Sequence, residues 1–121
     1  MRVVAAADLH GDLPHVPPCD LFLLGGDLCP FGSHRAGTQA EWLDTTFRRW
    51  LAALPAREVV GVAGNHDFLF EREPARVPRD LPWTYLQDSG CEFEGWRIWG
   101  SRPSSTGPST STRRAARPGG R

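Results

Sequence analysis

Three short clusters of carboxylate, imidazole and amide side chains are the residues of this chain best suited to catalysis. They are Asp8-Leu9-His10-Gly11-Asp12, Gly25-Gly26-Asp27 and Gly64-Asn65-His66-Asp67. These groups are ligands for hard and borderline divalent ions, and hydrolytic two-metal sites combine a bridging carboxylate with an open position for water. The clusters therefore predict half of a two-metal phosphoesterase site.

Each side chain has an expected role in that site. Asp8 and His10 are two residues apart, so on an extended chain both would point the same way. Asp27 is expected to bridge two ions, and Asn65 to be a neutral ligand of the second. His66 is expected to face the substrate, where it would either protonate the leaving oxygen or stabilise charge on the phosphoryl group.

Further acidic and histidine residues complete the candidate set. Either Asp67 or Asp12 could orient a histidine by a hydrogen bond. We assign Asp67 to the catalytic group together with His66. His15 and His34 have no comparable neighbours in the sequence, and we interpret them as loop residues.

The elements that position these clusters are predicted from the apolar runs before them. Residues 2–7, 20–24 and 58–63 are short, mostly apolar runs, typical of strands buried on both faces, and each ends at one cluster. Open α/β sheets bind ligands at the carboxyl ends of their strands. We therefore expect an α/β fold with the site at this edge of the sheet.

A helix is predicted between the second and third strands, over about 39–54. Thr38 and Glu41 have the spacing of a capping box, and Pro55 ends the helix. Its apolar stripe, at helical spacing, comprises Leu43, Phe47, Trp50, Leu51 and Leu54. Further strands are expected over 81–86, and over 91–94 and 96–99 as a hairpin with Glu94-Gly95 at its turn.

Composition divides the 121-residue chain into two parts. All fourteen acids lie in residues 1–100 beside nine arginines, which gives this part a net charge of −5. Residues 101–121 carry five arginines, no acid and no apolar residue larger than alanine. Such a segment buries too little surface to offset chain entropy, so we expect a folded part of about 100 residues and a disordered tail.

Partners and compartment follow from the same composition. A basic tail is compatible with nucleic acid, but a solvated extension is the favoured interpretation, so no nucleic-acid partner is expected. Three unevenly spaced cysteines indicate neither a disulfide framework nor a zinc site. No leader pattern and no run of about 18 apolar residues occurs, so we expect a cytoplasmic protein without membrane contact.

The three clusters resemble the first three motifs of the calcineurin-like metallophosphoesterase superfamily, over residues 1 to about 100. Residues 86–90 and 97–101 are similar to a small subgroup typified by mammalian metallophosphoesterase-domain proteins and their bacterial relatives. The resemblance implies the N-terminal half of a four-layer α/β/β/α fold and a phosphodiesterase acting on a small phosphoester. It also implies two divalent ions, often Mn, Fe or Zn, with Asp8, His10 and Asp27 on one ion, Asp27 and Asn65 on the other, and His66 catalytic.

The chain departs from the superfamily after residue 100. The later ligands of the family, usually a histidine near the end of the next strand and a Gly-His-x-His turn, have no counterpart here. We therefore expect a truncated bacterial member with a weakly bound second ion.

Fourteen arginines and no lysine suggest GC-rich codons, so residues 101–121 are expected to be an out-of-frame product. The alternative is a non-catalytic remnant or a binding domain with a basic tail.

Overall fold

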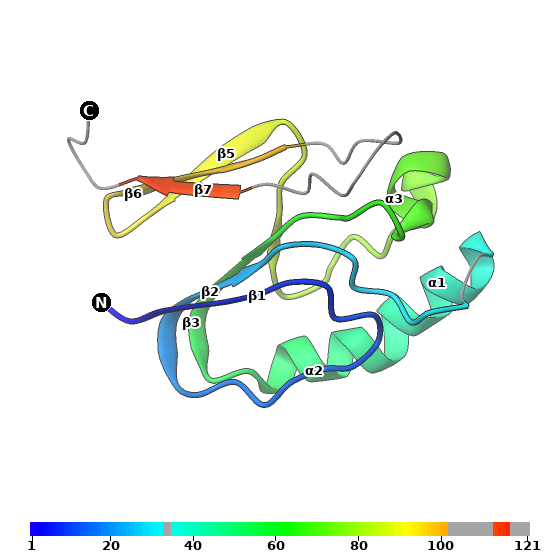
Figure 1. Ribbon diagram of the computed structural model, residues 1–121, viewed down its shortest axis with the longest axis horizontal. Coiled ribbons are helices and arrows are strands. Elements are labelled where there is room, and N and C mark those ends of the chain that lie inside the picture. Colours follow the sequence, from blue (N-terminus) through cyan, green and yellow to red (C-terminus); the bar gives the residue numbers. More distant parts are fainter. Residues whose placement is uncertain (33–34, 102–112, 117–121) are drawn as a thin grey trace.

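A four-stranded parallel sheet lies between a helical layer and a second sheet of three strands (Figure 1). The computed structural model describes residues 1–32, 35–101 and 113–116. The α/β class expected from the sequence is confirmed, with the parallel sheet built from the strands that precede the three clusters. These strands end at the same edge of the sheet, which brings the clusters together.

The parallel sheet has the strand order β1-β2-β3-β4. Its strands are β1 (Val3–Ala6), β2 (Cys19–Leu24), β3 (Ala56–Gly61) and β4 (Thr84–Tyr85). In β2, the four residues from Leu21 to Leu24 are all buried, as predicted for a strand covered on both faces. β4 has only two residues of the predicted 81–86, because Pro82 lacks a backbone N–H for the ladder.

The prediction that the first strand is buried on both faces is wrong. β1 alternates between exposed and half-buried residues, and Val3 exposes 40% of its surface. β1 is an edge strand, and the core against the second sheet is built from Leu21, Val60 and their neighbours rather than from β1. One face of β1 consequently remains open.

The helix between β2 and β3 comprises α1 (Ala36–Trp42), the π-helical turn η1 (Leu43–Phe47) and α2 (Arg48–Ala53). The predicted capping box is wrong, because the helix begins earlier than expected. The Gln39 N–H donates to the Arg35 carbonyl, so Thr38 lies inside the first turn. The N-cap is Arg35, which makes no side-chain cap hydrogen bond. Residue Leu54 has an extended backbone before Pro55, so the predicted end is confirmed.

The apolar stripe of this helix packs on the parallel sheet, as predicted. Leu43 and Phe47 are fully buried, and Leu51 exposes 3% of its surface. They belong to one core cluster with Phe22 and Leu24 of β2. At roughly 1.5–3 kcal/mol for each large apolar side chain buried, this cluster supplies much of the stabilisation of the helix.

The second sheet begins with the predicted hairpin. β5 (Ser89–Phe93) and β6 (Trp96–Gly100) pair antiparallel, and Glu94 and Gly95 have φ of 51° and 80°. Two consecutive positive φ angles are those of the type I′ turn that matches the twist of a hairpin. Ile98 is buried against the parallel sheet with Val60 and Val62, so the hairpin covers part of its second face.

Part of the expected disordered tail forms a strand. β7 (Arg113–Ala116) pairs antiparallel with β6, whose edge would otherwise present unpaired backbone groups. Backbone pairing needs no apolar side chain, which is why composition gave no sign of this strand. Residues 102–112 and 117–121 lie outside the described residues, and so does the rest of that prediction.

Two short helices follow the third cluster, α3 (Phe68–Arg72) and the 3-10 turn η2 (Pro74–Arg76). Cys19, Cys29 and Cys91 are free thiols, as expected. Across the described part of the chain, none of the helices has the length and apolar character needed to cross a membrane.

Candidate metal centre

The loops after β1 and β2 run side by side beyond the ends of their strands. The Asp8 N–H donates to the Gly26 carbonyl at 3.0 Å, and the His10 N–H donates to the Asp27 carbonyl at 2.9 Å. Backbone pairing therefore continues past the sheet. It brings two residues of the first cluster against the aspartate of the second.

Asp8, His10 and Asp27 form a cluster in which one ligand atom from each lies within 4.8 Å of the others. The grouping agrees with the prediction, but the expected extended backbone is wrong. The φ angles of Asp8, His10 and Asp27 are 56°, 48° and 53°, in the left-handed region. Their side chains meet because the backbone turns sharply at each residue, and not because residues two apart share a strand face.

Asp27 is held from the third cluster. It exposes 3% of its surface, and one carboxylate oxygen accepts the His66 N–H at 2.9 Å. Gly64 packs directly on Asp27, and a Cβ at Gly64 would lie 2.6 Å from the Asp27 Cγ. The glycine is therefore required for the close approach of the two loops.

Two buried polar atoms at the site have no hydrogen-bond partner among the described residues, namely His10 Nδ1 and Asn65 Oδ1. A buried polar atom left unpaired is costly, and such atoms call for a ligand or an ion. Two carboxylates, an imidazole and an amide oxygen are donors that Mn, Fe and Zn accept. The residues present therefore fit a divalent metal ion.

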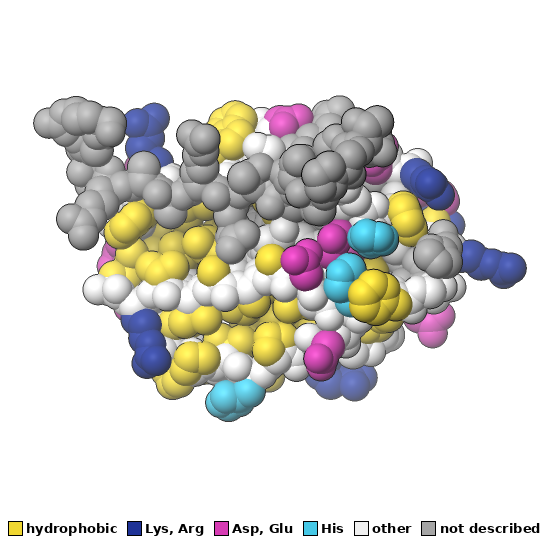
Figure 2. Space-filling view, in the orientation of Figure 1, with side chains coloured by type: hydrophobic (Ala, Val, Ile, Leu, Met, Phe, Trp, Pro, Cys, Tyr) yellow, Lys and Arg dark blue, Asp and Glu magenta, His cyan; other side chains and the backbone are white. Residues whose placement is uncertain are grey.

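His66 lies at the open side of this group. Its side chain is 55% exposed, and its Nδ1 is 3.5 Å from an Asp27 carboxylate oxygen. Its ring meets the His10 ring edge-on, with centroids 5.5 Å apart. Figure 2 shows acidic and histidine side chains gathered with a hydrophobic one on this part of the surface. The position allows His66 to reach a molecule bound over the cluster.

The whole of this site lies within one family match. The model of the calcineurin-like phosphoesterases matches residues 1–106, which include all three clusters and both strands of the hairpin. The chain belongs to the calcineurin-like phosphoesterase family. Members of this family typically bind divalent metal ions, in agreement with the Asp8, His10 and Asp27 cluster.

A second similarity concerns a much longer protein. This calcineurin-like phosphoesterase chain is 32% identical over 72 residues to the probable rhamnogalacturonate lyase C of Emericella nidulans. The aligned part is 60% of this chain and 6% of the lyase. So small a share of the lyase carries no argument about activity here.

The role predicted for Asp67 in orienting a histidine of this phosphoesterase is not the one the structure gives it. Asp67 exposes 1% of its surface, and both carboxylate oxygens accept the Leu28 N–H. They also accept the N–H groups of Cys29 and Gly64, at 2.9 and 2.8 Å. Asp67 therefore binds the loop after β2 to the loop after β3, which is a structural role.

Burial affects the protonation of this carboxyl group and of a neighbouring thiol. Desolvation raises the pKa of Asp67, although the hydrogen bonds from Gly64, Cys29 and Leu28 oppose that rise. Burial, and the proximity of Asp67 and Asp27, raise the pKa of Cys29 far above that of an ordinary thiol. In the chain without ions, Cys29 is therefore a neutral thiol at physiological pH.

Gln39 supports the third cluster, and sequence reasoning missed it. Its side chain is fully buried, donates to the His66 carbonyl at 2.8 Å and accepts the Leu69 N–H at 2.9 Å. It thereby ties α1 to the loop that carries Asn65 and His66. A glutamine within a helical pattern gives no sign of such a contact, because the partner is 27 residues away.

The remaining candidates lie apart from the cluster or outside the described residues. Asp12 and His15 are exposed, and His15 lies in a loop, as expected. The Asp12 N–H closes a turn on the Leu9 carbonyl, and the structure gives no support to Asp12 as a partner of a histidine ring. His34 lies outside the described residues.

Proposed function

We propose that this chain binds divalent metal ions at the carboxyl edge of its parallel sheet and hydrolyses small phosphoesters there. The observation that carries the proposal is the convergence of Asp8, His10 and Asp27 within 4.8 Å, beside the unpaired buried atoms of His10 and Asn65. Membership of the calcineurin-like phosphoesterase family supports the same reaction class.

The proposed roles divide the ligands between two ions. Asp8, His10 and Asp27 would hold the first ion, and Asp27 with Asn65 would hold the second. Bound ions would lower the pKa of a coordinated water and polarise the phosphoryl oxygens. With only two protein ligands in this chain, the second ion is expected to be the weaker.

His66 is proposed as the catalytic side chain. Its backbone is anchored on both sides, since the backbone N–H donates to an Asp27 carboxylate oxygen and the backbone carbonyl accepts from Gln39, while the ring stays exposed. From that position it would either donate a proton to the leaving oxygen or stabilise negative charge on the phosphoryl group. Both actions require that a substrate oxygen come within hydrogen-bond distance of the ring, and proton donation also requires that the ring carry the proton it transfers.

We further propose phosphodiesters as the substrate class and Mn, Fe or Zn as the ions. The support is the likeness of residues 86–90 and 97–101 to the phosphodiesterase subgroup, together with the mixed oxygen and nitrogen ligands of the cluster. These finer assignments rest on the sequence resemblance, and they refine the reaction class without altering the ligand set.

The test is hydrolysis of bis(p-nitrophenyl) phosphate by the purified chain with added Mn²⁺. Asp27→Asn is expected to reduce turnover at least about a hundredfold, because the bridging carboxylate is lost. Asp20→Asn is the matched control, since Asp20 lies at the opposite end of β2 and its carboxylate binds the Arg2 N–H. Turnover no higher than with Mn²⁺ alone would contradict the proposal and favour a non-catalytic chain.

A further inference from the structure

The imidazole of His10 lacks the hydrogen bond that normally orients a metal-binding histidine. Such a histidine usually donates its second ring N–H to a carboxylate or a carbonyl, which fixes the ring. Within the described residues the buried Nδ1 of His10 has no hydrogen-bond partner. Packing must therefore set the orientation of this ring.

The packing comes from Phe31. The rings of His10 and Phe31 are stacked, with centroids 4.0 Å apart and planes inclined by 13°. His66 meets the same imidazole edge-on, at an interplanar angle of 75°. One face of the His10 ring is thus covered by an aromatic ring, and its rotation about the Cβ–Cγ bond would break the stack.

Hydrophobic burial does not account for the position of Phe31. This side chain exposes 75% of its surface, more than any other large hydrophobic side chain in the described residues. An exposed phenylalanine gains little from removal of apolar area from water. Its ring stacks on His10, so its contribution is expected in the site rather than in the core.

The backbone before Phe31 is fixed against the loop of His10. The Gly11 N–H donates to the Leu28 carbonyl at 2.8 Å. Gly11 has φ of +84°, and a Cβ there would lie 2.7 Å from the Pro30 ring. Pro30 therefore rests directly on Gly11, the residue after His10. This contact delivers Phe31 over the imidazole.

We propose that Phe31 is a positioning residue that holds the His10 imidazole in the orientation needed to bind a divalent ion. The inference rests on the proposed metal site. Planar stacking here takes the place of the orienting hydrogen bond. The prediction is therefore specific to ring shape: another flat aromatic side chain should serve at position 31, and a branched aliphatic one should not.

The experiment is a titration of the purified chain with Mn²⁺, in which the EPR signal of free Mn²⁺ reports binding. Phe31→Leu is expected to weaken binding by about fivefold, the factor that corresponds to a typical aromatic pair. Phe31→Tyr is expected to bind as the wild type does. Trp99→Leu is the matched control, because Trp99 is 50% exposed and lies on β6 of the second sheet.

A second measurement needs no metal. The ring current of Phe31 should shift the NMR signals of the His10 ring protons upfield, and this shift should disappear in Phe31→Leu and persist in Phe31→Tyr. Thermal unfolding of all three proteins should be similar, because Phe31 is exposed. A purely structural role would instead change the unfolding midpoint.

The possible results separate the two proposals. If the wild type binds Mn²⁺ and Phe31→Leu binds it equally well, the inference about Phe31 is wrong and the metal site stands. If His10 ring signals are the same in the wild type and Phe31→Leu, the inference is also wrong. If wild type and Asp27→Asn bind Mn²⁺ equally weakly, the metal site itself is wrong, and the role of Phe31 falls with it.

Discussion

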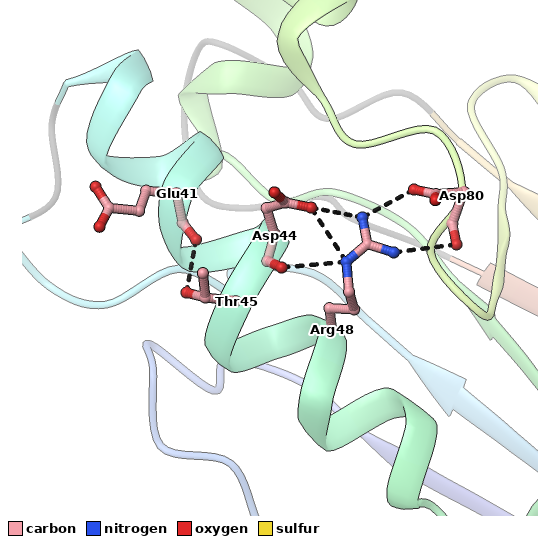
Figure 3. A network of polar contacts seen from close by, with 5 residues as sticks. All are labelled: Glu41, Asp44, Thr45, Arg48 and Asp80. Carbon is pink, nitrogen blue, oxygen red and sulfur yellow. Dashed lines mark hydrogen bonds and ion pairs between the residues drawn. The ribbon is translucent and has the colours of Figure 1, made fainter.

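Two polar networks of this chain join distant segments in opposite surroundings. One is buried and centred on the carboxylate of Asp67, and the other is exposed and centred on the guanidinium of Arg48 (Figure 3). Each is centred on one ionisable side chain that makes several hydrogen bonds. Their difference teaches that the surroundings of a network, rather than its number of contacts, decide how much the fold depends on it.

The buried network has no access to water. The three N–H groups that bind Asp67 belong to Leu28, Cys29 and Gly64, and all of these residues are buried. If the carboxylate were removed, water could not take its place without opening the loops. Each unpaired buried donor costs about 1–3 kcal/mol.

The exposed network is surrounded by solvent. The Arg48 guanidinium binds the Asp44 carboxylate one turn earlier in the helix, and binds Asp80 at 2.8 Å, before β4. The side chains of Arg48, Asp44 and Asp80 are 31%, 58% and 84% exposed. Water and salt compete for these groups, so exposed ion pairs of this kind contribute little to stability.

The largest effect is expected for Asp67→Asn. Both oxygens of Asp67 accept N–H groups, so the amide –NH₂ of asparagine must face a backbone donor. We expect a loss of about 3 kcal/mol in the free energy of unfolding. Urea denaturation followed by circular dichroism measures it. A loss as small as that of Arg48→Gln would remove the distinction between the two networks.

Gly64→Ala tests the close approach that the buried network maintains. The new Cβ would overlap Asp27, so Asp27 or the loop must move, and the proposed Mn²⁺ binding should weaken by roughly tenfold or more. Gly37→Ala is the matched control. A Cβ at Gly37, within α1, would meet only the end of the Arg76 side chain, at 3.1 Å. Calorimetric titration with Mn²⁺ checks both, and unchanged binding in Gly64→Ala would show that the loops can separate freely.

Gln39→Leu extends the comparison to a neutral buried group. Leucine fills a similar volume but leaves the His66 carbonyl and the Leu69 N–H without their partner. The expected loss is about 1–2 kcal/mol, smaller than for Asp67 because two backbone groups lose their partner rather than three. Hydrogen exchange at the Leu69 amide should accelerate by the factor that corresponds to this free energy. Full protection of that amide in the variant would contradict this role.

The smallest effect is expected for Arg48→Gln. Arg48 holds the pKa of Asp80 below its ordinary value of 3.8. The pair therefore contributes above that value, and its contribution is lost as the pH falls through the lowered folded pKa. In the variant, an NMR titration should return Asp80 to its ordinary range, with almost no change in the urea midpoint. A large midpoint change that persists in about 1 M salt would show that the network is not screened.

The sequence predicted the elements whose signals are local. Apolar runs identified the strands that precede Asp8, Asp27 and Asn65, and Glu94-Gly95 identified the hairpin turn. Pro55 identified the end of the helix for the same reason, since proline acts on its own neighbours. These features depend on a few adjacent residues, so a single sequence contains the information.

The errors concern features that depend on residues far along the chain. The exposed face of β1 follows from which strands the hairpin covers, and the early start of α1 accompanies the contact of Gln39 with the His66 loop. The structural role of Asp67 requires amides 38 and 39 residues away. In the site, residue types sufficed to name the three side chains that cluster. No sequence signal indicated the Phe31 stack, because a phenylalanine side chain has no metal-binding atom.

The left-handed backbone at Asp8, His10 and Asp27 has a consequence for the chain without ions. A non-glycine residue in this conformation costs roughly 1–2 kcal/mol, and glycine would relieve that cost but offers no donor atom. The protein thus sacrifices part of its own stability to present these three groups. An ion that binds only the folded form returns stability in proportion to the logarithm of its concentration. Folding of this small chain should therefore respond to the supply of metal in its surroundings.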